Sequence, residues 1–374
     1  HVLARKPLPS PLLVLTFTAY WLGTVAAPAL FGTHPNLSHD YLYTLAIGLA
    51  ALLIGTGEID DVLDTARDAL LLFILAGLAM VPLQPAMVMD TSYSQGLIAG
   101  LPRFGGLATH PVSMGMLAQI ALLLLWARPI ESKLLNRLCW AMGLAVLVLA
   151  QSKTAWVAFL LCSLCMLAMR HGGRVWRRVG DPRHGVFGIL VCLSVLLATV
   201  VALALLLGGT LQSGLAGFFS SSEGAQLVTL TGRDRIWAVA IEEWQANRMF
   251  GYGPDIWGAA YRAGINMPNA THAHNQFMDT LSRSGTVGAC ALVGYAAVLL
   301  GMSLRYAAAT RGLSLALFTA LALRSISEVP LILFGYGTEL FTHLLLLVTL
   351  ASAAAAAVRQ AAPTWAQARF GVAP

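Results

Sequence analysis

The sequence places a histidine where it could serve as a general base. His274 opens the run H-N-Q-F-M-D-T-L-S-R-S-G-T-V-G, which leads into a long apolar stretch. An imidazole changes its charge near neutral pH, so it can accept a proton from a reacting hydroxyl group. His272 lies two residues earlier, but no third ligand follows at a spacing typical of a metal site. We therefore expect a base at His274, with a purely structural histidine as the alternative and no bound metal.

Two arginines mark a possible anion site upstream of this histidine. Arg233 and Arg235 lie in T-G-R-D-R, where Thr231 and Asp234 resemble a capping box and predict a helix start near Gly232. The free N–H groups of a helix start attract anions, and a guanidinium matches the oxygens of a phosphate. The pattern favours phosphate binding. The alternative is an ion pair within the helix, to Asp234, Glu242 or Glu243.

Other charged residues lie beside or within apolar stretches. Arg103 stands in L-P-R-F-G-G, where it is either a ligand-binding residue or an interfacial anchor. Lys153 stands in Q-S-K-T at a turn, and a solvated lysine is the slightly favoured interpretation there. Arg283 and Arg324 fall in or near apolar stretches, and intramembrane charges usually line a cavity or form pairs. Glu328 is the carboxylate that could pair with either of them.

The elements that position these residues must be membrane helices. Hydrophobic residues make up 57% of the chain and charged residues 11%, too few to cover a water-facing surface. We expect an all-α, polytopic transmembrane bundle of about ten to twelve spans, because helices satisfy their own backbone groups in lipid. The predicted apolar stretches are 11–31, 41–56, 67–83, 107–127, 137–150, 154–170, 184–209, 276–304, 312–328 and 331–358.

The basic residues predict the orientation of this bundle. Most of the 23 lysines and arginines fall in connections that a ten-span topology places on one side, which the positive-inside rule makes the cytoplasm. The candidate site then faces the opposite side. We expect three regions: N-terminal membrane helices over 1–209, a large helical segment outside the membrane over 210–275, and C-terminal membrane helices over 276–374.

These motifs resemble a known family. His274 and Asn275, then nine residues, then G-T-V-G match the H-[NSQ]-x9-G-x-x-[GTY] motif of bacterial O-antigen ligases (the WaaL family). T-G-R-D-R-I-W, G-Y-G-P, R-F-x-G and Q-S-K-T also resemble segments of the broader ligase and polymerase superfamily. Many relatives have arginine at the position of Lys153, and the resemblance covers about residues 100–290.

The resemblance implies a glycosyltransferase of the C-type membrane class, in the inner membrane of a Gram-negative bacterium. Its donor would be a glycan linked to undecaprenyl diphosphate in the periplasm, and its acceptor a sugar hydroxyl of the lipid A core. No cofactor and no nucleic acid would take part. His274 would be the catalytic residue, Arg103, Arg233 and Arg235 would bind the diphosphate, and the supporting residues would be Lys153, Asn275, Arg283, Arg324 and Glu328.

Alternative functions remain open at this point. An O-antigen polymerase or a protein O-oligosaccharyltransferase would share the donor and the membrane face and would differ in the acceptor. A transporter of lipid-linked glycans is a further alternative, because intramembrane Arg283 and Arg324 would suit a translocation path. The chain lacks the similar halves that transporters often have, which favours an enzyme.

Overall fold

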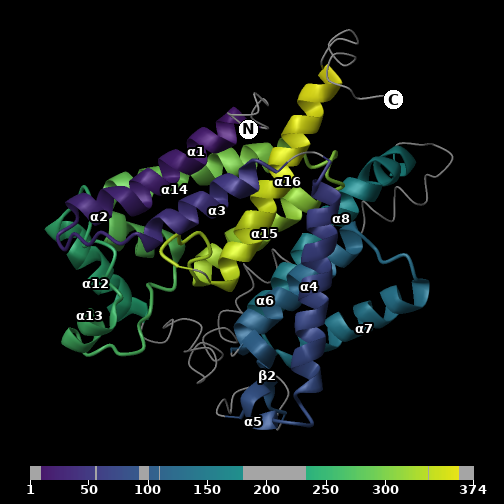
Figure 1. The fold of residues 1–374 in the computed structure, drawn as a ribbon, viewed down its shortest axis with the longest axis horizontal. Coiled ribbons are helices and arrows are strands. Elements are labelled where there is room, and N and C mark those ends of the chain that lie inside the picture. Colours follow the sequence, from purple (N-terminus) through teal and green to yellow (C-terminus); the bar gives the residue numbers. More distant parts are fainter. Residues whose placement is uncertain are drawn as a thin grey trace, which may run out of the picture.

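The computed structural model describes residues 10–54, 57–91, 101–108, 110–179, 233–335 and 337–361. These residues form a bundle of helices with one pair of two-residue antiparallel strands (Figure 1). The elements are α1 (Pro11–Trp21), a π-helical turn (Leu22–Ala26), α2 (Ala27–Phe31), α3 (Asp40–Leu52), α4 (Ile59–Ala79), α5 (Pro85–Val88), β1 (Met89–Asp90), β2 (Arg103–Phe104), α6 (Pro111–Ala127), α7 (Lys133–Leu149), α8 (Lys153–Val179), α12 (Arg233–Ala246), α13 (Ala259–Gly264), α14 (Gln276–Arg305), α15 (Leu313–Ser327) and α16 (Thr338–Ala361).

The helices start where local chemistry favours a start. Ser132 Oγ accepts a hydrogen bond from the N–H of Leu135 at the start of α7, and Asn275 Oδ1 accepts one from the N–H of Met278 at the start of α14. Pro111 occupies the first position of α6, where a missing N–H costs nothing. The predicted helix start near Gly232 stays a prediction, because residue 232 lies outside the described part of the chain and α12 is described from Arg233 onward.

Helix α6 lies at the centre of the bundle. Its residues from Ile120 to Leu125 are fully buried, and α4, α7, α8 and α15 surround it. The outer helices instead expose apolar side chains: Val157, Leu160 and Leu164 of α8 are each more than half exposed. An exposed apolar stripe of this kind suits contact with lipid.

The predicted apolar stretches correspond to helices throughout the described part of the chain, whereas 184–209 lies outside it. Four helical segments are long and apolar enough to cross a membrane: Pro11–Phe31, Lys153–His171, Gln276–Arg305 and Thr338–Gln360. The last predicted stretch differs from expectation, since residues 331–335 are not helical and α16 begins only at Thr338. The architecture is that of a polytopic helical membrane protein.

Basic residues meet at one end of the bundle, as their positions in the sequence predict. Arg128, which follows α6, pairs with Asp64 of α4 (3.1 Å), and Arg67 of α4 donates to the Arg128 carbonyl. Arg170 of α8 donates to the Trp126 carbonyl at the same end (3.0 Å). The opposite ends of α6 and α8 carry His110 and Lys153, so those two candidate site residues lie away from the basic end.

Candidate functional site

His274 belongs to a compact group of three side chains, here called the histidine–glutamate cluster: His272, His274 and Glu328. His272 Nε2 lies 3.2 Å from Glu328 Oε2, and His274 Nδ1 lies 3.6 Å from the same oxygen. The two imidazole ring centroids are 4.1 Å apart. About a quarter of each of these side chains is exposed, so the cluster is open to a ligand from one side.

Helix ends bring Glu328 to the two histidines, although it lies more than fifty residues further along the chain. Glu328 directly follows α15, and Asn275 Nδ2 donates to the carbonyl of Ile326 at the end of that helix (3.3 Å). We expected Glu328 to pair with Arg283 or Arg324. The structure pairs Arg283 with Asp279 and Arg324 with Glu339 instead, each at 3.3 Å, which leaves the Glu328 carboxylate to the histidines.

Hydrogen bonds assign the protons of the cluster. The N–H of His274 donates to His272 Nδ1 (3.1 Å), so a neutral His272 carries its proton on Nε2 and donates it to Glu328. Burial lowers the pKa of His272, and the neighbouring His274 lowers it further. Burial acts to raise the pKa of Glu328, but the nearby His274 ring and the charges of His272 and Arg324 outweigh it, so this pKa is lowered. Glu328 is therefore a carboxylate facing the imidazole of His274.

The same three side chains offer metal-ligand atoms within 4.8 Å of one another. The hydrogen bonding does not fit a metal site. A histidine that binds a metal usually donates its other ring N–H to an acceptor, whereas His272 Nδ1 accepts a bond from the backbone and its Nε2 proton points at Glu328. The arrangement instead suits proton transfer, with Glu328 ready to stabilise a protonated His274.

The R-F-x-G and Q-S-K-T motifs lie together. Arg103 is buried in β2, and its Nε donates to the carbonyl of Ala150 (3.3 Å). In return, Gln151 Nε2 donates to the carbonyl of Leu101 (3.0 Å). Lys153 begins α8 directly after these contacts and is exposed. Arg103 and Lys153 therefore belong to two segments that contact each other, although they are about fifty residues apart in the sequence.

His110 is close enough to both Arg103 and the histidine–glutamate cluster for their charges to act on it. It precedes α6 and lies within electrostatic range of Arg103, Glu328 and Arg324. Burial lowers the pKa of His110, and the positive charge of Arg103 lowers it further. A neutral His110 thus lies amid two guanidinium groups and the carboxylate of the cluster.

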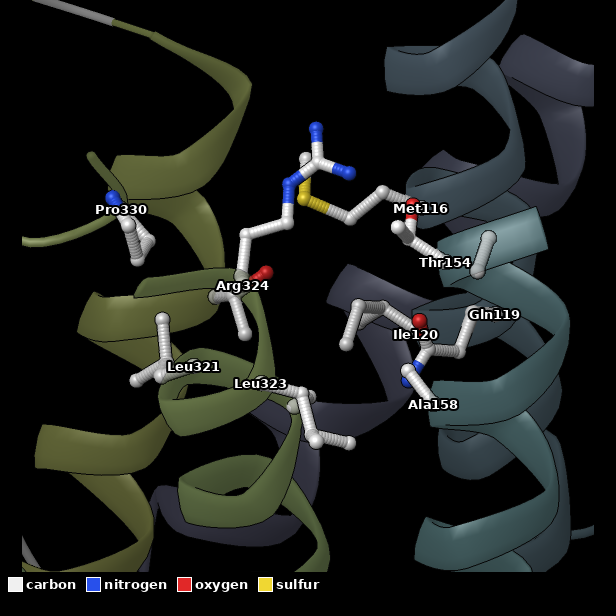
Figure 2. Close-up of a pocket in the computed structure, with 12 residues that line it drawn as sticks. Met116, Gln119, Ile120, Thr154, Ala158, Leu321, Leu323, Arg324 and Pro330 are labelled. Atoms are coloured by element: carbon white, nitrogen blue, oxygen red, sulfur yellow. The ribbon is translucent and has the colours of Figure 1, made fainter. Parts of the chain in front are cut away.

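Arg324 lines a small cavity between α15 on one side and α6 and α8 on the other (Figure 2). Met116, Ile120 and Leu321 contribute apolar walls. The Arg324 guanidinium points away from Leu321, toward Met116 (Figure 2), and its Nε is buried without a hydrogen-bond partner among the described residues.

Arg233 and Arg235 of α12, which the sequence alone does not distinguish, differ in their side-chain contacts. Arg235 is exposed and donates to the carbonyl of Ile265 (3.1 Å). The side chain of Arg233 forms no ion pair or hydrogen bond in the part of the chain that the structure describes, so the alternative of an intrahelical ion pair is not observed there. Arg233 precedes Trp237 by one turn on the same helical face. Trp237 Nε1 donates to the carbonyl of Ala273 (2.9 Å), so this face leads toward His274.

The glycine of the histidine motif marks a break in α14 that the sequence did not reveal. Gly285 has φ +62° and ψ −160°, and the turn at 247–253 bonds to the broken helix. The N–H of Tyr252 donates to Ser282 and the N–H of Thr286 donates to Arg248, each at 2.8 Å. A Cβ atom on Gly285 would lie 2.4 Å from the backbone of Met249. The G-Y-G-P and G-T-V-G motifs are therefore the two sides of one backbone contact.

Among the predicted site residues, the structure gathers His274, Asn275 and Glu328, with Arg103 and Arg324 close enough to act on His110 and Glu328. The side chains of Arg235 and Arg283 bond to groups outside this cluster. Arg283 is buried, bonds to Asp279 and donates to the carbonyl of Pro254. His110 and His272 are the site residues that sequence reasoning missed. Only the H-x-H spacing hinted at His272.

Comparison with known proteins agrees with the motifs. Residues 138–293 match the family model described as O-antigen ligase, a family that includes both ligases and polymerases. No curated protein matches the chain. The matched range includes Arg233 and His274, whereas Arg103, Arg324 and Glu328 lie outside it. The predicted resemblance to the O-antigen ligase family is confirmed over residues 138–293, which are fewer than half of the chain.

Proposed function

We propose that this protein is an O-antigen ligase. It transfers a glycan from undecaprenyl diphosphate to a sugar hydroxyl of the lipid A core, at the periplasmic face of a Gram-negative inner membrane and without a metal. The observation that carries this proposal is the histidine–glutamate cluster, in which His274 faces the ionised Glu328 beside Arg324. The match of residues 138–293 to the O-antigen ligase family model supports a lipid-linked glycan as the substrate.

The chemistry begins at the acceptor. His274 accepts the proton of the acceptor hydroxyl as its oxygen attacks the anomeric carbon of the donor sugar. The bond between that carbon and the diphosphate oxygen breaks, and its electron pair leaves with undecaprenyl diphosphate. Glu328 stabilises the imidazolium that forms at His274. A direct displacement of this kind inverts the anomeric centre.

The leaving diphosphate gains negative charge, which cationic side chains stabilise. Arg103 and Arg233 are our principal candidates, and the structure adds Arg324 at the mouth of the apolar cavity. Lys153 is exposed beside Arg103 and supports the same site, while Arg235 contributes less because it bonds to Ile265. Removing one such donor typically lowers the rate by about 10²–10³-fold.

The decisive experiment measures transfer in vitro from a defined lipid-linked donor to a defined lipid A core. We expect His274→Ala to abolish transfer and Arg233→Ala to reduce it mainly through use of the donor. His39→Ala is the matched control, because His39 is an exposed histidine that pairs only with the adjacent Asp40 among the described residues. Full transfer by His274→Ala, with wild-type insertion and folding, would refute the role of His274 as base.

The family match also admits a second function, an O-antigen polymerase, and the same chemistry admits a protein O-oligosaccharyltransferase. Deletion of the gene separates these functions. Accumulation of unligated lipid-linked polymer supports the ligase. Lipopolysaccharide carrying a single repeat supports the polymerase, and loss of glycan from protein supports the oligosaccharyltransferase. Transfer by the purified protein without ATP would exclude transport as its sole activity.

A further inference from the structure

The backbone of His274 adopts a conformation that a histidine rarely takes. Its φ is +49°, in the left-handed region. A residue other than glycine held there costs about 1–3 kcal/mol and persists only when its surroundings fix it in place. The structure therefore has to contain groups that hold this segment.

Two side chains meet this need by bonding both backbone groups of Ala273, the residue before His274. The N–H of Ala273 donates to Asp279 Oδ1 (3.1 Å). The carbonyl of Ala273 accepts the indole N–H of Trp237 (2.9 Å). Asp279 is almost fully buried and Ala273 fully buried, so these bonds are shielded from competing water.

Asp279 and Trp237, which form these two bonds, are themselves held by other parts of the structure. The second oxygen of Asp279 accepts from Arg283 Nε (3.3 Å), and Arg283 in turn donates to the carbonyl of Pro254. Trp237 lies on α12, one turn after Arg233 on the same face. The histidine segment is thus tied on one side to the broken helix α14 and on the other side to the helix that carries Arg233.

We propose that Trp237 and Asp279 are positioning residues that hold the His274 backbone in its left-handed conformation and so direct its imidazole at the acceptor hydroxyl. The proposal rests on the proposed role of His274 as base. It also implies that the base and the donor-binding Arg233 are carried by one rigid unit, because Trp237 joins α12 to the His272–His274 segment.

The first test compares two tryptophans of α12. Trp237→Phe removes the N–H that bonds to Ala273 and keeps an aromatic ring. Trp244→Phe makes the same chemical change on the same helix, but its indole donates to Thr286 Oγ1 (3.1 Å) and not to the histidine segment. We expect Trp237→Phe to lower kcat by about tenfold to a hundredfold with little change in the KM for the donor, because small misplacement of a reacting group is costly. Trp244→Phe should lower kcat by less than about threefold, since the hydrogen bond that it removes lies outside the His272–His274 segment.

The second test uses Asp279 and keeps the proposal testable if Trp237→Phe folds poorly. Asp279→Asn retains an amide oxygen for the Ala273 N–H, whereas Asp279→Ala removes the acceptor altogether. We expect the asparagine variant to retain at least about tenfold more activity than the alanine variant at equal thermal stability. Equal losses in the two variants would overturn the proposal.

A third measurement does not depend on transfer. Diethyl pyrocarbonate modifies accessible neutral histidines, and mass spectrometry can follow the modification of His274. We expect Trp237→Phe to raise this rate several-fold over wild type and Trp244→Phe to leave it unchanged. Unchanged reactivity at His274 in Trp237→Phe, or a kinetic loss confined to KM, would overturn the positioning role. Absence of transfer in wild type with the predicted change in reactivity would instead count against the proposed function alone.

Discussion

At the scale of the residue, the site depends on how Glu328 is shared. One carboxylate oxygen lies near both histidines, and Arg324 lies within electrostatic range. His272 is a neutral donor to this carboxylate, and in the proposed mechanism a ring nitrogen of His274 accepts the proton of the reacting hydroxyl. The two histidines at H-x-H spacing have different hydrogen bonds, and the proposal gives them different roles.

Removal of the Glu328 charge should impair catalysis without removing the base. We expect Glu328→Gln to lower kcat on the order of 10²-fold, less than the roughly 10⁴-fold loss for a tightly bonded triad carboxylate, because the contact to His274 is 3.6 Å. Steady-state kinetics of transfer would measure the change. Glu131→Gln, at the end of the bundle away from the cluster, should behave as wild type. An unaffected Glu328→Gln enzyme would show that the carboxylate does not support the base.

The pH dependence follows from the same contacts. Because the pKa of Glu328 is lowered, its charged form is present above the ordinary range of glutamate and is lost only as the pH falls below that range. The pKa of His272 is also lowered, so His272 stays neutral as the pH falls toward its ordinary pKa. We therefore expect neither Glu328 nor His272 to change its charge between about pH 8 and the ordinary pKa of histidine, so neither group should lower kcat/KM in that window. A plot of log kcat/KM against pH with a slope of two in that window would contradict this expectation.

At the scale of the element, the break in α14 shapes the site. Gly285 lets the helix open and accept the backbone of the turn at 247–253, which also supports the Arg283 and Pro254 contact. Gly294 lies in the same helix with no atom near its missing Cβ. The two glycines therefore differ in function although both lie in one apolar helix.

This difference predicts opposite effects of the same substitution. Gly285→Ala should destabilise the protein by about 1–3 kcal/mol or more and lower transfer, because its φ is positive and a Cβ would meet Met249. Gly294→Ala should be neutral or stabilising by up to about 1 kcal/mol, since alanine favours a helix. Thermal unfolding in detergent measures both. Equal stability of the two variants would show that the break is not needed.

At the scale of the whole molecule, the bundle has two chemically different ends. Arg67, Arg128 and Arg170 meet at one end, and the histidine–glutamate cluster lies toward the end of α6 that carries His110. We infer that the basic end faces the cytoplasm, because positive charge is retained on that side. The site then faces the periplasm, where a lipid-linked glycan donor and the lipid A core would meet.

Cysteine labelling in intact spheroplasts would test this orientation. In a cysteine-free background, Thr271→Cys, an exposed position beside His272, should react with a membrane-impermeant maleimide from outside. Glu131→Cys, exposed in the connection between α6 and α7, should react only after the membrane is permeabilised. The reverse pattern would place the site in the cytoplasm and remove the proposed donor from its reach.

The sequence alone determined the membrane class and most helix positions, and it predicts His274 as the base. These features depend on local composition and spacing, because the length of an apolar stretch sets a helix in lipid and a short motif carries the resemblance to a family.

Only the tertiary structure decided how the site is assembled. Glu328 reaches His274 across more than fifty residues, and Arg283 turns to Asp279 because a buried charge takes the nearest partner that its helix offers. The break at Gly285 depends on a turn that arrives from another segment. Pairings between distant segments leave no periodic signal in a single sequence, since they are set by how helices pack and not by which residues are neighbours along the chain.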